Sequence, residues 1–289
     1  MDGGGYADAA WWGTAIADGL WKDGQVTRRW LVVDEARSSK GKTKYAERGE
    51  QANRPRNFGS PFNLPNHPVV GINWYEAIAF CEWLTARWRA KGWLEANQFV
   101  MLPNEPEWEK AARGGLQLPA QPIVLSPQQC ATLHRVLAEQ SASALRIANS
   151  QLARRYAWGN TADPERGNYD DTGLNATSAL GCFPNPDSPY GCEDMSGNVF
   201  EWTRSQYGPW QLKEGDWSVK LKFKYPYLMD DRERLEGGDQ IARVLRGGSW
   251  GYGDHFARAA YRARYLPALR DDVNGFRVVV GFAPVGSTL

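Results

Sequence analysis

The sequence contains few of the residues that bind transition metals. Among 289 residues there are four cysteines and three histidines. No two cysteines have the CxxC spacing of a zinc site, so a structural zinc site is not expected. Cys182 and Cys192 flank a loop rich in Pro and Gly and could pair, but in a reducing compartment we expect free thiols.

An excess of charge and long apolar runs are also absent. The chain has 34 Lys and Arg against 33 Asp and Glu, a net charge of +1. This balance gives no basic field for nucleic acid. No apolar run approaches the roughly 18 residues of a membrane helix, and the first residues lack the basic and apolar regions of a signal peptide. We therefore expect a cytoplasmic protein that binds neither nucleic acid nor a membrane.

Tryptophan and glycine, by contrast, are abundant, with 14 Trp and 30 Gly. Large aromatic anchors combined with many turn residues favour a mixed fold rich in loops and argue against a long helical bundle. With 42% hydrophobic residues the chain can bury a sizeable core. Its length allows one large domain or two small ones, at roughly 150 residues a domain.

Two helices are predicted by capping residues and by the spacing of apolar residues. The first begins after Asn73 and ends at Gly92, and the second begins after Asn104, with Pro106 in its first turn, and ends at Gly114. The charged residues of the first helix are expected to face solvent: Glu76, Glu82 and Arg87.

The remaining segments show less regular patterns. The first sixty residues predict little regular structure apart from the strand-like "LWKDGQVTRRWLVV". Residues 116–155 are rich in Gln, Ala and Ser and predict an inserted helical segment. Its apolar face would contain Leu133, Val136, Leu137, Leu145 and Ile147. The stretch from Tyr156 to Trp202 is rich in Gly, Asn, Asp and Pro, which predicts a long ordered coil. Such coils are usually functional or are held by an ion.

Six stretches in a fixed order resemble the formylglycine-generating-enzyme (sulfatase-modifying factor) family. They are "NHPVVGINWYEAIAFCEWL", "LPNEPEWEKAARGG", "YAWGN", "PYGCEDMSGNVFEWT", "RVLRGGSW" and "NGFRVV". The resemblance implies an α+β, C-type-lectin-like fold with much irregular coil, as a single domain over residues 1–289. Residues 116–155 are extra. Family domains usually begin with strands upstream of "GGYADAAWWG", so the chain resembles the C-terminal part of a longer protein or a shortened variant.

The chemistry of this family is not implied for this chain, because its ligands are missing. The oxygen-dependent members bind copper through two cysteines after "GGS", and no cysteine follows Cys192 here. Related iron-dependent sulfoxide synthases use a histidine triad, and His255 is the one histidine of the C-terminal segment. We therefore expect no enzyme and neither copper nor iron. The alternative is a metal-dependent oxidoreductase of either type with an atypical metal site. A third reading, a carbohydrate lectin, would need an exposed Ca²⁺.

The segment from residue 249 to residue 277 resembles the variable region of a diversity-generating retroelement protein. In such systems AAC codons become NNC codons, which cannot encode Lys, Glu, Gln, Met or Trp, and residues 251–277 contain none of these five. Positions that match the fixed scaffold are Arg258, Ala260, Arg262, Pro267, Arg270 and Asn274. The three arginines among them are expected to be held by hydrogen bonds to the backbone or to carboxylates. Predicted variable positions are Gly251, Tyr252, Gly253, His255, Phe256, Tyr261, Arg264, Tyr265, Leu266, Leu269, Asp271, Asp272 and Val273.

Seven of these side chains are expected to form one solvent-facing patch: Tyr252, His255, Phe256, Tyr261, Arg264, Tyr265 and Leu266. Tyr and Arg suit such a surface because they offer large contact areas and directional hydrogen bonds. The sequence thus predicts a ligand-binding protein whose partner is another protein or a different macromolecule. The alternative for this aromatic cluster is a buried core strand.

Calcium is the one cofactor that the resemblance implies. Asp194 and Glu201, with the backbone carbonyls of Gly197 and Val199, match the positions of a family calcium site, and hard oxygen ligands suit Ca²⁺. The alternative is that the two carboxylates only cap turns. A second candidate site consists of Asn168, Tyr169 and Asp171.

Overall fold

The computed structural model describes residues 4–33, 45–132, 146–183, 188–213, 216–228 and 230–282. Within these residues the α-helices are α1 (Gly13–Ala17), α2 (Trp74–Ala90) and α3 (Glu105–Arg113). The short 3₁₀ helices are η1 (Ala9–Trp11), η2 (Pro127–Thr132), η3 (Asp170–Thr172), η4 (Asp231–Glu233) and η5 (Asp254–Ala257). The strands are β1 (Trp21–Lys22), β2 (Gln25–Val33), β3 (Tyr45–Ala52), β4 (Gln98–Met101), β5 (Gln117–Pro119), β6 (Arg146–Ala148), β7 (Phe200–Lys213), β8 (Asp216–Val219), β9 (Ile241–Arg246), β10 (Ala263–Tyr265), β11 (Asn274–Phe276) and β12 (Val279–Phe282).

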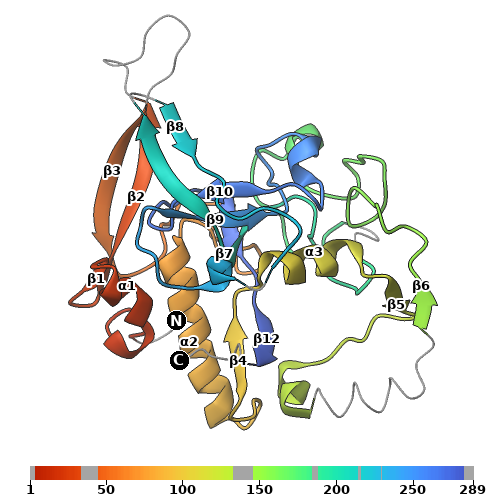
Figure 1. Ribbon diagram of the computed structural model, residues 1–289, viewed down its shortest axis with the longest axis horizontal. Coiled ribbons are helices and arrows are strands. Elements are labelled where there is room, and N and C mark those ends of the chain that lie inside the picture. Colours follow the sequence, from red (N-terminus) through yellow and green to blue (C-terminus); the bar gives the residue numbers. More distant parts are fainter. Residues whose placement is uncertain are drawn as a thin grey trace, which may run out of the picture.

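The central sheet has the strand order β10-β9-β7-β11, with β8 paired to β7. Its pairings are antiparallel except for β11, which runs parallel to β7. Strand β12 pairs with β4 beside α2, and Figure 1 shows α2 and this pair side by side below the central sheet. The described α-helices alternate with strands in the first part of the chain, the later strands pair mostly antiparallel, and much coil joins the elements. The prediction of an α+β fold is confirmed.

Helix α2 carries the main apolar core. Asn73 caps it, because its side chain accepts a hydrogen bond from the Glu76 N–H while the Glu76 carboxylate accepts one from the Asn73 N–H. Trp74 is fully buried and donates its indole N–H to the Thr203 carbonyl on β7. The predicted helix is therefore confirmed. Among the described helices, none is long and apolar enough to cross a membrane.

One charged residue of α2 does not face solvent as predicted. Glu76 is buried, lies 3.6 Å from Nε of Arg28 on β2, and accepts a hydrogen bond from the Tyr6 hydroxyl. The spacing of apolar residues gave no sign of this, because the partners come from the N-terminal segment, which packs over the start of the helix.

The N-terminal region contains more regular structure than predicted. Strands β1, β2 and β3 form an antiparallel sheet, and β2 and β3 pair from Val26 opposite Ala52 to Val33 opposite Tyr45. The sequence of β3, "YAERGEQA", has little strand propensity, and most of its residues are exposed. Pairing with β2 therefore decides its conformation.

The predicted helical insertion at residues 116–155 is wrong at its described ends. Residues 117–119 and 146–148 pair as strands β5 and β6, and Ile147 is exposed on β6. The predicted positions Leu133, Val136, Leu137 and Leu145 lie outside the described residues. Strands β5 and β6 are short and are stabilised by pairing with each other. The sequence pattern of one segment does not reveal such a distant partner.

Candidate functional site

The C-terminal segment 249–277 is held from the end of β9 by Arg246. The guanidinium of this fully buried residue lies 3.3 Å from Glu105 and 2.7 Å from Glu109 on α3. It also donates hydrogen bonds to the carbonyl oxygens of Ala259, at 2.7 Å, and Tyr261, at 3.0 Å. A single buried cation thus ties the irregular backbone to a helix.

Two predicted scaffold arginines are anchored in the same way. Arg262 forms a bidentate pair with Glu105, with Nη2 at 2.8 Å from Oε2. Arg270 is buried, and its Nε lies 3.3 Å from Glu50 on β3. Arg258 is only partly buried, and its Nη2 lies 3.9 Å from the nearest carboxylate. Anchoring by ion pairs is therefore confirmed for Arg262 and Arg270 and is weak at Arg258.

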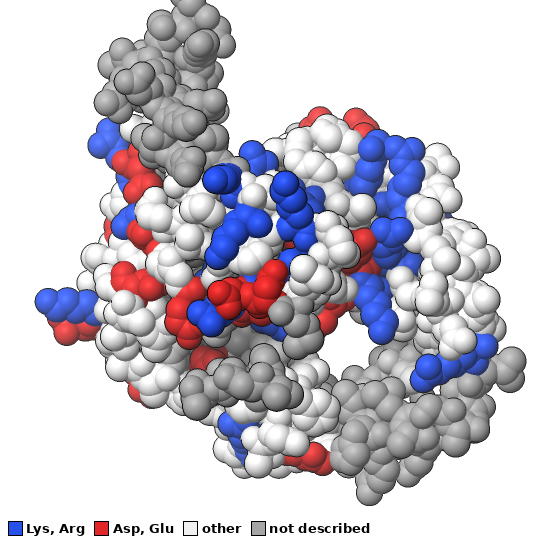
Figure 2. All heavy atoms as spheres, in the orientation of Figure 1, with Lys and Arg blue, Asp and Glu red and all other residues white. Residues whose placement is uncertain are grey.

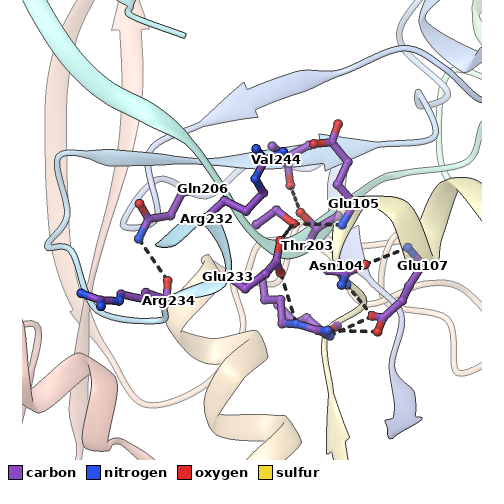
Figure 3. Close-up of polar contacts among 12 residues, drawn as sticks. Asn104, Glu105, Glu107, Thr203, Gln206, Arg232, Glu233, Arg234 and Val244 are labelled. Atoms are coloured by element: carbon purple, nitrogen blue, oxygen red, sulfur yellow. Dashed lines mark hydrogen bonds and ion pairs between the residues drawn. The ribbon is translucent and has the colours of Figure 1, made fainter. Parts of the chain in front are cut away.

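The shared acceptor Glu105 is itself fixed at the junction of α3 and β7. Its backbone N–H donates to the Ser205 hydroxyl at 2.9 Å, and Asn104 caps the helix in front of it. Figure 3 shows this junction, including the hydrogen bond from the Thr203 hydroxyl to the Val244 carbonyl on β9. In Figure 2, acidic side chains lie near the centre of this face with basic ones beside them, so charges of both signs meet there.

The later part of the segment is fixed through its backbone. The Pro267 carbonyl accepts a hydrogen bond from the Trp74 N–H at 3.0 Å. The Ala268 carbonyl accepts one from the Arg29 N–H on β2, and the Arg29 carbonyl accepts one from the Arg270 N–H, both at 2.8 Å. These backbone hydrogen bonds take the place of the regular β-sheet hydrogen bonds that an irregular segment lacks.

Three predicted variable positions are buried: Leu266, Leu269 and Val273, the last of which is 9% exposed. Leu266 is 2% exposed and Leu269 is 0% exposed, and both pack with Ala242 of β9. The prediction that Leu266 faces solvent is wrong, and Leu269 is buried beside it, because the backbone bonds to β2 and α2 turn this stretch inward. Close-packed positions of this kind do not accept many different side chains.

The predicted variable positions other than Leu266 and Leu269 surround a pocket of about 200 Å³. Those that line it are Tyr252, Phe256, Tyr261, Arg264, Tyr265, Asp271 and Val273. The pocket is completed by residues outside the predicted variable positions, namely Phe200, Leu245, Ala263 and Asn274. The sequence gave no sign of these, because they come from β7, β9, β10 and β11 and meet only in the folded sheet. Gly251 and His255 are exposed beside it in the same segment, and Gly253 and Asp272 are half-buried.

The aromatic walls meet at steep angles. Tyr252 and Phe256 have ring centroids 5.0 Å apart with an interplanar angle of 71°. Phe256 and Tyr261 lie 4.8 Å apart at 68°, and Phe200 and Tyr252 lie 5.3 Å apart at 76°. Such edge-to-face contacts give the cluster a fixed shape while 40% of Tyr252 stays exposed.

Asp271 is the carboxylate of the pocket. Its Oδ2 accepts a hydrogen bond from the Tyr265 hydroxyl at 3.3 Å, and its Oδ1 accepts one from the Asp272 N–H at 2.9 Å. Burial, together with the neighbouring Asp272, raises the pKa of Asp271 to about 6. The guanidinium carbon of Arg264 lies 5.6 Å from the ring centroid of Tyr207, which is not part of the lining.

The first predicted calcium site does not fit the ion. Both oxygens of Glu201 accept hydrogen bonds from Arg277, with Nη2 2.6 Å from Oε1, and Oε2 also accepts one from the Trp108 indole. Asp194 accepts a hydrogen bond from the Gly181 N–H, and burial raises the pKa of its carboxyl. A guanidinium therefore already occupies the position of a cation at Glu201. Calcium at Asp194, Gly197, Val199 and Glu201 stays a prediction of the sequence alone.

The second predicted calcium site combines buried and exposed groups. Asn168 and Tyr169 are buried, whereas Asp171 is exposed on η3. Neither the Asn168 Oδ1 nor the Tyr169 hydroxyl has a hydrogen-bond partner among the residues that the structure describes. In the described part of the chain, no group of three or more His, Cys, Asp or Glu residues could hold a metal ion. All four cysteines are free thiols.

Curated relatives cover a range of activities. Inactive C-alpha-formylglycine-generating enzyme 2 of Bos taurus is 28% identical over 229 residues, 74% of this chain and 50% of that protein. Hercynine oxygenase of Mycobacterium tuberculosis is 28% identical over 280 residues, 96% of this chain and 48% of that protein. Serine/threonine-protein kinase pkn1 of Chlamydia pneumoniae is 29% identical over 212 residues, 73% of this chain and 23% of that protein. The chain thus spans half or less of these relatives.

Among solved structures, Treponema denticola variable protein 1 has a TM-score of 0.49 and 18% identity, with 90% of this chain and 95% of that chain covered. PvdO from Pseudomonas aeruginosa has a TM-score of 0.41 and 19% identity, with 84% and 69% covered. The model of the sulfatase-modifying factor enzyme 1-like domain matches residues 22–281, nearly the whole chain. The fold that the six sequence stretches implied is confirmed, and the chain belongs to the sulfatase-modifying factor enzyme 1-like domain family.

Proposed function

We propose that the chain is a ligand-binding domain and not an enzyme, and that its ligand contacts the pocket and the exposed side chains around it. The observation that carries the proposal is the convergence of separate predicted variable positions on one pocket. The arginines that hold the backbone, Arg246, Arg262 and Arg270, are engaged in ion pairs outside it. Pocket side chains can therefore change while the anchors preserve the backbone.

The finer proposal is that a retroelement diversifies this pocket. Residues 251–277 lack all five residue types that an NNC codon cannot encode. The neighbouring DNA tests this: we expect a reverse transcriptase gene and a near-copy of codons 249–277 that differs only at adenines. A near-copy that differs equally at all four bases would contradict diversification.

The alternative, an oxidoreductase, has a relative in its favour, since one curated relative is an oxygenase and another is an inactive enzyme. The absence of suitable metal ligands from the described lining of the pocket argues against an oxidoreductase. Neither Cys nor His lines the pocket, and copper chemistry of the family type needs soft thiolate ligands. Stoichiometric copper binding together with oxygen consumption on a cysteine-containing peptide would overturn the proposal.

A panel of alanine variants tests whether the pocket side chains belong to a binding surface. Tyr252→Ala, His255→Ala and Arg264→Ala should each change the free energy of unfolding by no more than about 0.5 kcal/mol, because these side chains are exposed. Leu269→Ala in the same segment is the matched core control and should cost about 2–5 kcal/mol. Thermal and urea unfolding measure both. Losses of several kcal/mol at Tyr252 or Arg264 would mean that the segment is core, and the binding proposal would fail.

A further inference from the structure

The pocket combines aromatic rings with a carboxylate, Asp271, that forms no ion pair with a cation of the described residues. Ion pairs between described residues in the segment 251–277 use other acids: Arg258 and His255 pair with Asp254, Arg262 with Glu105, Arg270 with Glu50 and Arg277 with Glu201. Asp271 and Asp272 have no ion pair within the described part of the chain. A half-buried carboxylate without a counter-ion is unfavourable, and a ligand of opposite charge would relieve it.

The ring arrangement favours the same kind of ligand. Tyr252, Phe256 and Tyr261 are steeply inclined to one another, so rings approach the pocket from different directions and do not form one flat stack. The face of an aromatic ring is electron-rich and attracts ammonium groups, most strongly where water is excluded. Aromatic walls with an adjacent carboxylate therefore favour an organic cation over a neutral group of the same shape.

The one cation of the lining does not neutralise Asp271. The guanidinium of Arg264 lies against Tyr207, and Arg264 is exposed. The hydroxyl of Tyr265 donates a hydrogen bond to Asp271, and Arg270, which is paired with Glu50, is the cation close enough to act on that hydroxyl. Arg264 is thus placed to contact the part of a ligand that extends out of the pocket.

The volume of the pocket limits the size of the ligand that it can bind. A pocket of about 200 Å³ accepts a primary or quaternary ammonium group with a short alkyl chain, but not a folded segment of a partner. We propose that the pocket formed by Tyr252, Phe256, Tyr261, Tyr265 and Asp271 binds an aliphatic ammonium group. The inference rests on the proposed binding function and names the chemistry of its ligand. The group can belong to a small molecule or to a lysine side chain of a partner.

Calorimetric titration of the full chain with choline tests the charge requirement. The matched control is 3,3-dimethyl-1-butanol, which has the same shape without the charge. Choline should bind at one site, at least about fivefold more tightly than the neutral alcohol, as expected for a cation on aromatic faces. n-Butylammonium and the peptide Gly-Lys-Gly should compete with choline. Tighter binding of the peptide indicates a partner protein as the source, and tighter binding of the amine a small molecule.

Variants assign the binding to the pocket. Asp271→Asn and Tyr252→Leu should each weaken choline binding by about threefold to tenfold, whereas Tyr252→Phe, which retains the ring, should bind nearly as the parent does. Asp163→Asn and Tyr225→Leu lie outside the pocket and should change nothing. Thermal melts of all variants show that each is folded.

The outcomes separate this inference from the proposed function. If the neutral alcohol binds as tightly as choline and Tyr252→Leu abolishes both, the pocket binds ligands without preference for charge and only the inference fails. Absence of any choline binding also overturns it. The proposed binding function is contradicted by a different result, namely that Tyr252→Leu destabilises the protein as strongly as a core substitution would.

Discussion

Two irregular regions of this protein differ in where their polar side chains find partners. The coil from residue 156 to residue 198 uses its amides internally: Asn198 exchanges two hydrogen bonds with the backbone of Ser178, and Asn168 donates to the Ala176 carbonyl. The segment 249–277 instead takes its polar contacts largely from α3, β2 and β3. The contacts of the segment 249–277 come mostly from other elements and leave the side chains around its pocket available for binding, whereas the amide side chains of the coil are used in its own turns.

The largest expected effect is that of replacing Arg246, which holds the segment 249–277 from the end of β9. Arg246→Met removes the buried cation that contacts Glu105, Glu109 and the Ala259 carbonyl. The carbonyl loses this donor, and the two carboxylates keep only Arg262 and Arg113 as ion-pair partners. We expect a loss of about 3–5 kcal/mol in the free energy of unfolding, the usual result of breaking a buried ion pair. Urea denaturation measures it. Lys110→Met on the exposed side of α3 is the control. A loss below 1 kcal/mol would show that the segment does not depend on this arginine.

The anchor of the coil should have a smaller effect. Arg277 pairs with Glu201 and donates to the carbonyls of Glu193 and Asp194, but its side chain is about one-quarter exposed. Arg277→Leu should therefore destabilise the protein by about 2 kcal/mol. Amide hydrogen exchange should show faster exchange in the coil than in the segment 249–277. Equal acceleration in both regions would contradict the view that the two are anchored separately.

Ligand binding should depend on pH in a way that reports on Asp271. A carboxyl with a pKa of about 6 is ionised at pH 7.5 and mostly protonated at pH 5. A cation binds the ionised form, so choline affinity should be greatest above pH 7 and should fall by up to about tenfold as the pH drops from 6 to 5. Titrations at three pH values measure this.

Other titratable or charged groups lie at or near the same pocket, namely Asp272, Tyr252, Tyr261, Tyr265, Arg264 and Arg270. The ring of His255 lies tilted against Phe256, with centroids 4.0 Å apart. The control is therefore Asp271→Asn, whose weaker binding should vary little with pH. An undiminished pH dependence in this variant would assign the titration to one of the other groups.

The smallest expected effect is that of calcium removal. Because Arg277 occupies the cation position at Glu201, adding a chelator should leave the melting temperature unchanged. The control is the same melt with excess Ca²⁺. A drop in melting temperature with chelator, lost in Asp194→Ala or Glu201→Ala, would instead restore the calcium site and make the coil a region held by an ion.

Local patterns predicted only part of this structure. Helices α2 and α3 follow from their caps and the spacing of apolar residues, both of which are local. Strand β3 did not, because a polar strand is stabilised by its neighbour and not by its own composition. Leu266 and Leu269 were misplaced because the segment has no period from which an inward face can be assigned.

The candidate site, like the fold, could be predicted from the sequence only in part. Sequence composition identified the segment, its aromatic and acidic residues and the anchoring roles of Arg262 and Arg270, since these depend on residue identity. Only the tertiary structure decided that Phe200 and Leu245 close the pocket, that Glu105 receives both Arg246 and Arg262, and that Arg277 takes the position expected for calcium. The physical reason is distance along the chain. Hydrogen bonds and ion pairs act over a few ångströms, and only folding brings such separate residues within that range.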